Sequence, residues 1–198
     1  MPSSITLILA SIFCYFLGNI SPSIILGKLI AKKDIRTLGS GNAGTTNVLR
    51  TMGKVPAAIT LIVDIAKGAV AVIVGNYFGG QDLAMLCGLA AFIGHIWPAL
   101  YGFKGGKGIA TAAGVIITLE PLMGLIVAVI GVGVIAVSKR VSIGAMVAAV
   151  SLPIVSYFFD PKYVIWSCIM AIIIFIRHRE NIKRLIKGEE PKLNFKLK

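Results

Sequence analysis

The chain has 198 residues, of which 57% are hydrophobic and only 14% are charged, so it is too apolar for an ordinary soluble domain. Its net charge of +12 could suit nucleic acid, but the basic residues stand at the ends of apolar runs, as in proteins anchored at the cytoplasmic face of a membrane. Composition therefore excludes a soluble domain and argues against a nucleic-acid partner.

The first apolar run, Ile5 to Ile30, is predicted to be a retained membrane span. It has no basic flank before it and no small-residue cleavage site after it, which a secretory signal would need. The sequence from Gly18 to Pro22 predicts a kink within this span, with the freed backbone groups satisfied inside the protein.

A polar, glycine-rich segment follows, from Gly39 to Arg50. Glycine lets backbone N–H groups approach anionic oxygens, a cation neutralises them, and hydroxyl or amide side chains fix their orientation. A solvated loop would not need so many polar side chains, and a Walker or Rossmann loop would need a strand that the sequence does not supply. The segment predicts a phosphate site with candidate residues Ser40, Asn42, Thr46, Asn47 and Arg50.

Two further spans are predicted at Val55 to Phe78 and Leu83 to Tyr101. The first contains Asp64 and Lys67 one helical turn apart, and the second contains His95 near its inner end. Ionisable groups inside spans are costly and are therefore functional candidates. Asp64 and Lys67 can neutralise each other, which favours a structural role, whereas His95 fits packing and support of the next segment equally well.

That next segment runs from Phe103 to Gly108 and holds Gly105 and Gly106 between Lys104 and Lys107. Because a predicted helix begins directly after it, we expect the two glycines to present N–H groups to an anion at a helix N-terminus. A basic turn at the cytoplasmic face would explain the lysines but not the glycines.

Four shorter apolar runs complete the chain: Ile109 to Leu119, Leu122 to Ser138, Val141 to Phe158 and Tyr163 to Ile176. The first of them covers only about half of a hydrocarbon core about 30 Å thick, so it is either a half-span or joined to its successor through a kink. Joining them would place Lys139, Arg140 and the basic tail outside, against the positive-inside bias. We therefore predict an all-α, polytopic, seven-span helical bundle over residues 1–198 as one domain, with an external N-terminus and a cytoplasmic C-terminus.

The third polar segment follows the last run, where His178 stands between two arginines and Asn181 lies three residues on, on the same helical face. The arginines alone would suit a basic cluster that meets anionic lipid, but His178 and Asn181 together favour a site. Ser142 is a weaker candidate for phosphate recognition. In the predicted topology all three segments emerge at the cytoplasmic face, so we predict one composite site there.

No metal site is expected, because Cys14, Cys87 and Cys168 lie in apolar runs without the spacing of metal ligands.

Together the motifs resemble the bacterial membrane family of acyl-phosphate-dependent glycerol-3-phosphate acyltransferases, the PlsY type, over nearly the full length. The residues that carry the resemblance are Gly39 to Asn47, Gly94 to Pro98 with Phe103 to Gly108, and His178 to Asn181, and Thr45 stands where the family more often has alanine. The resemblance implies transfer of a fatty acyl group from acyl phosphate to the 1-hydroxyl of glycerol 3-phosphate, giving 1-acylglycerol 3-phosphate and inorganic phosphate. This is a step of phospholipid synthesis at the cytoplasmic face of a bacterial inner membrane, and no cofactor or obligatory protein partner is expected.

The expected roles divide into phosphate recognition and chemistry. Phosphate recognition is assigned to Arg50, Lys104, Gly105, Gly106 and Lys107, and more weakly to Ser142. Ser40, His178 and Asn181 are expected to position the hydroxyl and to donate transition-state hydrogen bonds, with Lys107 also counted among the catalytic groups, and a substrate phosphate is expected to take the hydroxyl proton, assisted by His178. The competing hypothesis is a carrier for a small phosphorylated anion, but the predicted outer loops hold no matching basic cluster.

Overall fold

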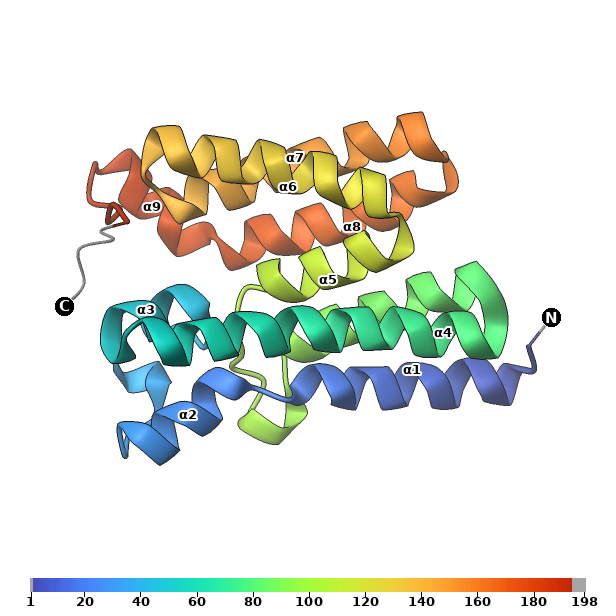
Figure 1. Cartoon of the computed structure of the whole chain (residues 1–198), viewed down its shortest axis with the longest axis horizontal. Helices are drawn as coiled ribbons and strands as arrows, with labels where there is room; N and C mark the ends of the chain where they lie inside the picture. The colour runs from blue at the N-terminus through green and yellow to red at the C-terminus, as the bar shows by residue number, and fades with distance from the viewer. Residues whose placement is uncertain (1, 194–198) are drawn as a thin grey trace. The chain divides into compact units, whose positions relative to one another are not determined.

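The computed structural model describes residues 2–193, and within them the chain is helical and contains no strand (Figure 1). The chain divides into two compact units: the N-terminal unit extends through Leu119, and the C-terminal unit begins at Glu120. Each predicted apolar run is largely helical. The all-α prediction is therefore confirmed for the described residues.

In the N-terminal unit the first predicted span consists of two helices, α1 (Ser4–Asn19) and α2 (Pro22–Ile30). The break between them is the predicted kink. Pro22 opens α2, where its missing N–H removes no helical hydrogen bond. The longer of the two, α1, lies along α4 (Lys54–Ile96), as Figure 1 shows.

Helix α4 contains a reversal at Gly79–Gly80, and its two arms match the second and third predicted spans. Gly80 has φ +68°, a conformation that favours glycine. A Cβ on Gly75 would meet backbone atoms of Leu83 and Ala84, so the arms 54–78 and 81–96 pack backbone against backbone beside the turn.

Helix α5 (Ile109–Leu119) packs against α4, and each of the two helices contributes a glycine to the contact. A Cβ on Gly68 would meet the carbonyl of Thr111, and one on Gly114 would meet the carbonyl of Ile65. Short elements fill the polar segments of this unit: the 3₁₀ helices η1 (Ile35–Thr37) and η2 (Ala99–Tyr101), and α3 (Thr45–Met52). The sequence pattern predicts no helix in this region, so α3 is a finding of the structure.

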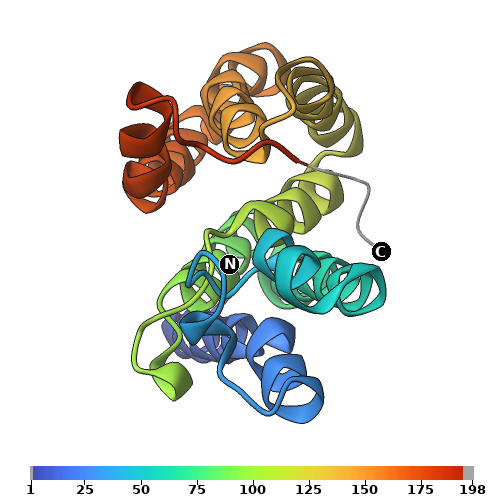
Figure 2. The ribbon, with the colours of Figure 1, turned by 90° about the vertical axis from the view of Figure 1, so that its left-hand side faces the viewer.

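The C-terminal unit contains α6 (Pro121–Ser138), α7 (Val141–Phe159), α8 (Lys162–Arg177) and the short α9 (Arg179–Ile186). Within it α7 contacts both α6 and α8, and Figure 2 shows the three helices nearly end-on. Gly144 of α7 lies against the carbonyl of Gly131 in α6, which brings these two helices close together.

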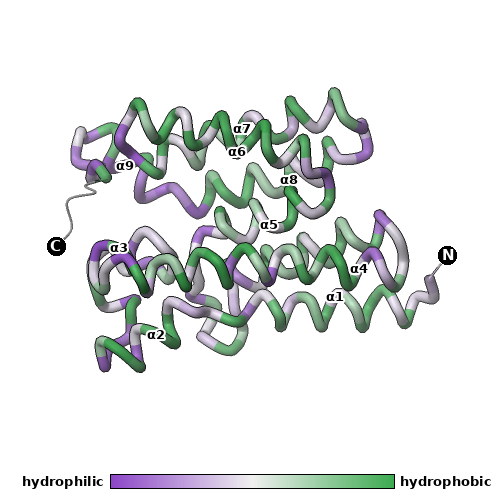
Figure 3. The backbone as a smooth tube through the Cα atoms, in the orientation of Figure 1, coloured by the Kyte–Doolittle hydropathy of each residue, from purple (hydrophilic) through white to green (hydrophobic). Residues whose placement is uncertain are grey.

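The helix surfaces are strongly apolar. Large side chains such as Ile62, Val129 and Ile165 are 65%, 62% and 75% exposed, and hydrophilic residues gather at the helix ends (Figure 3). By length and composition, four segments could cross a membrane: Ser4–Ile30, Lys54–Tyr101, Pro121–Ser138 and Val141–Phe159. Exposed apolar surface of this extent is suited to lipid rather than water.

Candidate functional site

The N-terminal unit brings the first two polar segments side by side, and Arg36, in η1 just before the first segment, bonds to the second. Its guanidinium donates to the carbonyl oxygens of Tyr101 at 2.7 Å and Lys104 at 3.3 Å. Gly106 approaches the first segment so closely that a Cβ on it would lie 2.7 Å from the carbonyl oxygen of Ala43. This part of the predicted convergence is confirmed, although the sequence reading did not single out Arg36.

Asp34 holds Arg36 in place. One carboxylate oxygen caps η1 by accepting from the backbone N–H of Arg36 at 2.9 Å, and the guanidinium donates to both oxygens at 2.7 to 3.1 Å. These bonds lower the pKa of Asp34 below its usual range and raise that of Arg36. Both groups are therefore charged at neutral pH, and the bridge to the second segment is fixed.

Asn47 shapes the first segment from inside. Its side-chain oxygen accepts from the N–H of Ser40 at 2.9 Å, while its amide nitrogen donates to the carbonyls of Leu38 at 2.9 Å and Ile35 at 3.2 Å. It is buried, so its task is to fold the loop rather than to face solvent. Among the other predicted residues of this segment Ser40 and Arg50 are exposed, and Asn42 and Thr46 are half-buried.

The second segment differs from its prediction in one respect. The N–H of Gly105 donates to the carbonyl of Ile96 at 3.1 Å and that of Gly106 to the carbonyl of His95 at 3.2 Å. The expectation that these N–H groups face an anion is therefore wrong. The glycines instead permit close packing, because a Cβ on Gly105 would meet the His95 carbonyl and one on Gly106 would meet the His95 ring.

The cations of the second segment have different exposures: Lys104 is exposed and Lys107 is half-buried. Gly108, with φ +83°, then turns the chain into α5. The loop between η2 and α5 thus places two lysines close to the segment that contains Ser40 and Arg50.

In the C-terminal unit His178 is 2% exposed and ends α8. Its Nδ1 lies 2.8 Å from the carbonyl oxygen of Ile174. A carbonyl only accepts, so Nδ1 carries a hydrogen and, in the neutral ring, Nε2 is the nitrogen with a lone pair. The ring can therefore accept a proton at Nε2.

A residue that the sequence reading missed, Glu190, joins two that it predicted. Ser142 and Asn181 both donate to Glu190 Oε1 at 2.6 Å, and Arg184 donates to Oε2 at 2.7 Å. Burial raises the pKa of Glu190, but these three hydrogen bonds outweigh it and hold the pKa below its ordinary value. Ser142 and Asn181 thus meet at one buried carboxylate.

The segment around Glu190 is held by its backbone as well. Its carbonyl accepts from Arg140 Nε at 3.2 Å, and the N–H of Leu193 donates to the carbonyl of Lys139 at 2.6 Å. The only sequence signal was an acidic pair after Gly188 in an otherwise basic tail. The convergence of the third segment with the first two stays a prediction.

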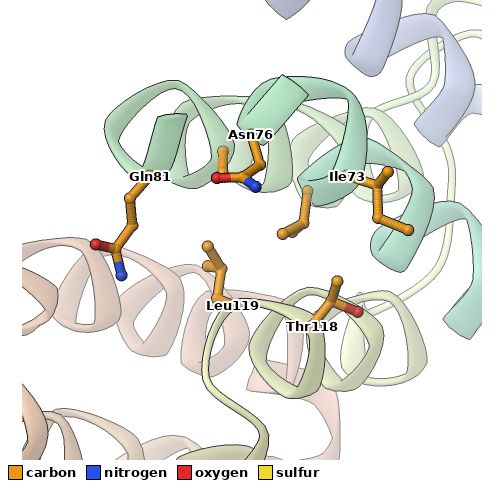
Figure 4. A pocket seen from close by; sticks show the side chains of 7 residues that line it. Ile73, Asn76, Gln81, Thr118 and Leu119 are labelled. Carbon is orange, nitrogen blue, oxygen red and sulfur yellow. The ribbon is translucent and has the colours of Figure 1, made fainter. Parts of the chain in front are cut away.

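A cavity of about 360 Å³ lies in the N-terminal unit, beside the reversal of α4 (Figure 4). Asn76, Gln81 and Thr118 supply its polar groups, and no charged side chain lines it. It lacks the cations that a phosphate site needs, so it is separate from the candidate site.

Fold and composition define an all-helical integral membrane protein with basic, polar segments at its helix ends. The family model described as glycerol-3-phosphate acyltransferase matches residues 8–188. The chain belongs to this family and is an acyltransferase.

Relatives named glycerol-3-phosphate acyltransferase match over nearly their whole length. That of Thermoanaerobacter pseudethanolicus is 44% identical over 191 residues, covering 96% of each chain, and that of Alkaliphilus metalliredigens is 43% identical over 189 residues, covering 96% of this chain and 97% of its own. The crystal structure of PlsY, an integral membrane glycerol 3-phosphate acyltransferase in its glycerol 3-phosphate form, is 32% identical with a TM-score of 0.90, covering 95% of this chain and 96% of that one.

Proposed function

We propose that this protein transfers an acyl group from acyl phosphate to the 1-hydroxyl of glycerol 3-phosphate, releasing 1-acylglycerol 3-phosphate and inorganic phosphate. The observation that carries the proposal is the junction in the N-terminal unit, where the loop with Lys104 and Lys107 lies against the Gly39–Arg50 segment at Gly106 and Ala43. Arg36, just before that segment, donates to the Lys104 carbonyl and holds the loop there. Cations and hydroxyl groups gathered in this way suit phosphate, which both substrates contain.

The similar proteins support the acceptor and the product. The relatives are named for glycerol 3-phosphate, and crystal structures of PlsY exist in a glycerol 3-phosphate form and in a lysophosphatidic acid form, the latter matching this chain with a TM-score of 0.87. The acyl phosphate donor is supported by the motif resemblance alone.

The chemistry is a single displacement at a carbonyl carbon. The hydroxyl oxygen of glycerol 3-phosphate forms the new ester bond, the bond between the acyl carbon and the phosphate oxygen breaks, and phosphate leaves with the electron pair. Lys104, Lys107 and Arg50 are proposed to bind the phosphates, with Ser40 orienting the hydroxyl. Acyl phosphate is already activated, so positioning and oxyanion stabilisation supply most of the rate.

The proton of the attacking hydroxyl passes to a substrate phosphate or to Nε2 of His178. This ring is suited to the role because its Nδ1 hydrogen is held by the Ile174 carbonyl. Asn181 is proposed to act with His178, while Glu190 fixes the direction of the Asn181 amide. No metal is proposed to take part, so excess chelator should leave turnover intact.

We further propose seven spans as one functional domain in a bacterial inner membrane, with the N-terminus outside and the active site and C-terminus cytoplasmic. In a chain freed of its native cysteines, single cysteines at the exposed positions Thr37, Phe103 and Lys187 should resist an impermeant thiol reagent in intact cells. One at Asp82, in the turn of α4, should react. Labelling at Phe103 from outside contradicts this topology.

The decisive experiment supplies purified protein in detergent with palmitoyl phosphate and glycerol 3-phosphate. Product and phosphate should form in equal amounts, and palmitoyl-CoA should not replace the donor. Equal turnover with the thioester would overturn the donor assignment. No product, together with transport of glycerol 3-phosphate into liposomes that contain the protein, would establish a carrier instead.

A further inference from the structure

Asp64, Lys67 and His95 form a buried polar cluster between the two arms of α4, and all three are at most 6% exposed. Lys67 Nζ lies 2.8 Å from Asp64 Oδ1 and 2.9 Å from His95 Nδ1, and it donates to the carbonyl oxygen of Ile20 at 2.7 Å. Ile20 is in the break between α1 and α2, so its carbonyl has no helical partner there. The cluster thus connects this break to both arms of α4.

The ammonium of Lys67 fixes the tautomer of His95. An ammonium has three N–H bonds and no lone pair, and here three acceptor atoms surround it: the Ile20 carbonyl, the Asp64 carboxylate and His95 Nδ1. A hydrogen on Nδ1 would set two donors against each other at 2.9 Å. Asp64 Oδ1 lies farther from Nδ1, at 3.2 Å, and is already paired with Lys67. Nδ1 is therefore the acceptor, and Nε2 carries the hydrogen.

The opposite edge of the same ring lies against the glycine-lysine loop. His95 Nε2 is the atom nearest to the place where a Cβ on Gly106 would stand, and the His95 carbonyl accepts the N–H of Gly106. Lys107 follows directly. His95 therefore contacts the charge cluster through Nδ1, and it contacts the loop through both its ring and its backbone carbonyl.

We propose that Asp64 and Lys67 are positioning residues for the acyltransferase reaction: they hold His95 as the Nε2–H tautomer against Gly106, and so fix the loop that presents Lys107. This inference rests on the proposed phosphate-binding role of that loop. Mutual neutralisation of Asp64 and Lys67, one turn apart, would not require contact with His95 or Ile20. The contacts of Lys67 with His95 and with the Ile20 carbonyl therefore indicate that the ion pair also positions its neighbours.

The first test is spectroscopic and does not depend on activity. The chain has only two histidines, and the structure assigns them opposite tautomers, Nε2–H for His95 and Nδ1–H for His178. Protein labelled with ¹⁵N-histidine should show one ring of each kind, assigned with a His178→Ala variant. An Nδ1–H tautomer at His95 in the wild-type protein would overturn the proposal even if the enzyme is fully active.

The second test uses Lys67→Met and the double variant Asp64→Leu/Lys67→Met, which leaves no unpaired buried carboxylate. In both, the His95 spectrum should change and the KM for glycerol 3-phosphate should rise about 3- to 10-fold, the loss expected for one hydrogen bond. Thr60→Val is the control, because Thr60 is buried one turn earlier in α4 and bonds only to Pro56 among the contacts described.

A structural role alone predicts a different result: lower thermal stability, with the remaining folded enzyme showing wild-type KM and an unchanged His95 tautomer. That outcome in the double variant overturns the proposal. As a further check His95→Gln, which can place an amide N–H near the position of Nε2, should retain a lower KM than His95→Ala. Wild-type protein that forms no product would refute the proposed function instead, while the tautomer measurement would still decide the state of the cluster.

Discussion

Replacing Glu190 tests how the C-terminal unit holds Ser142 and Asn181. In Glu190→Ala three side-chain donors lose their acceptor, two of them at 2.6 Å from the same oxygen. Hydrogen bonds to a charged group contribute about 1.5 to 3 kcal/mol each. The net loss is smaller than the sum of three such bonds, because the Arg184 side chain is 35% exposed and water can replace its lost acceptor. We expect a net cost of about 2 to 4 kcal/mol, or about 5 to 15 °C in thermal midpoint for a chain of this size.

The assay is thermal unfolding in detergent beside measurement of kcat. Glu189→Ala is the matched control, since Glu189 is the exposed neighbour, and its midpoint should stay within about 2 °C of wild type. Glu190→Ala should also lower kcat, because the Asn181 amide loses the contact that fixes its direction. Equal midpoints and equal kcat for Glu190→Ala and Glu189→Ala would refute the reasoning.

The stabilisation contributed by Glu190 depends on pH with a definite sign. The pKa of Glu190 is lower in the folded protein than in the unfolded chain. Its stabilisation is therefore complete above the unfolded pKa, which is about 4.3 for glutamate, and is lost as the pH falls through the folded pKa. The difference in midpoint between wild type and Glu190→Gln should accordingly shrink on acidification below about pH 4. A difference that grows over this range contradicts the assignment.

Three further variants test the N-terminal unit. Gly106→Ala should raise the KM for glycerol 3-phosphate, because its Cβ would meet the His95 ring and displace the loop, whereas Gly133→Ala, with open space around it, should behave as wild type in the same assay. Lys107→Ala should raise that KM about 10- to 100-fold, the loss of one charge-assisted contact, and Lys187→Ala, exposed at the end of α9, should not. Arg36→Met should release the Tyr101 carbonyl and hasten proteolysis of the 34–44 segment, and an unchanged cleavage rate would contradict its bridging role.

The helices were predictable because glycine, proline and charged residues clearly separate the apolar runs. Gly79–Gly80, Pro121 and the Lys139–Arg140 pair end or begin helices at the expected places. Helix α3 was not, because its eight residues follow glycine and begin with two β-branched threonines, and an isolated helix of that length is marginal. It is stabilised by burial of Val48 with Ile24 and Ile35, contacts that only the folded chain shows.

The site was predictable in its residue types but not in its hydrogen bonds. A composition typical of phosphate-binding segments identified the three segments. It could not show that the N–H groups of Gly105 and Gly106 donate to backbone carbonyls. Nor could it show that Glu190, in a basic tail, is buried against Ser142. Pairings between residues distant in sequence leave no local pattern.

The reversal of α4 has a consequence for membrane insertion. Asp64 and Lys67 are on its first arm and His95 is on its second, so the ion pair contacts His95 only when the two arms fold together. A charged side chain at the centre of a lone helix costs about 2.5 to 3.5 kcal/mol on insertion scales. Because only two glycines separate the arms, the helices can enter lipid as a closed hairpin in which the Asp64–Lys67 pair already has His95 as a further polar partner. The glycine pair thereby makes it feasible for an apolar chain to keep an ammonium and a carboxylate at the depth of its core.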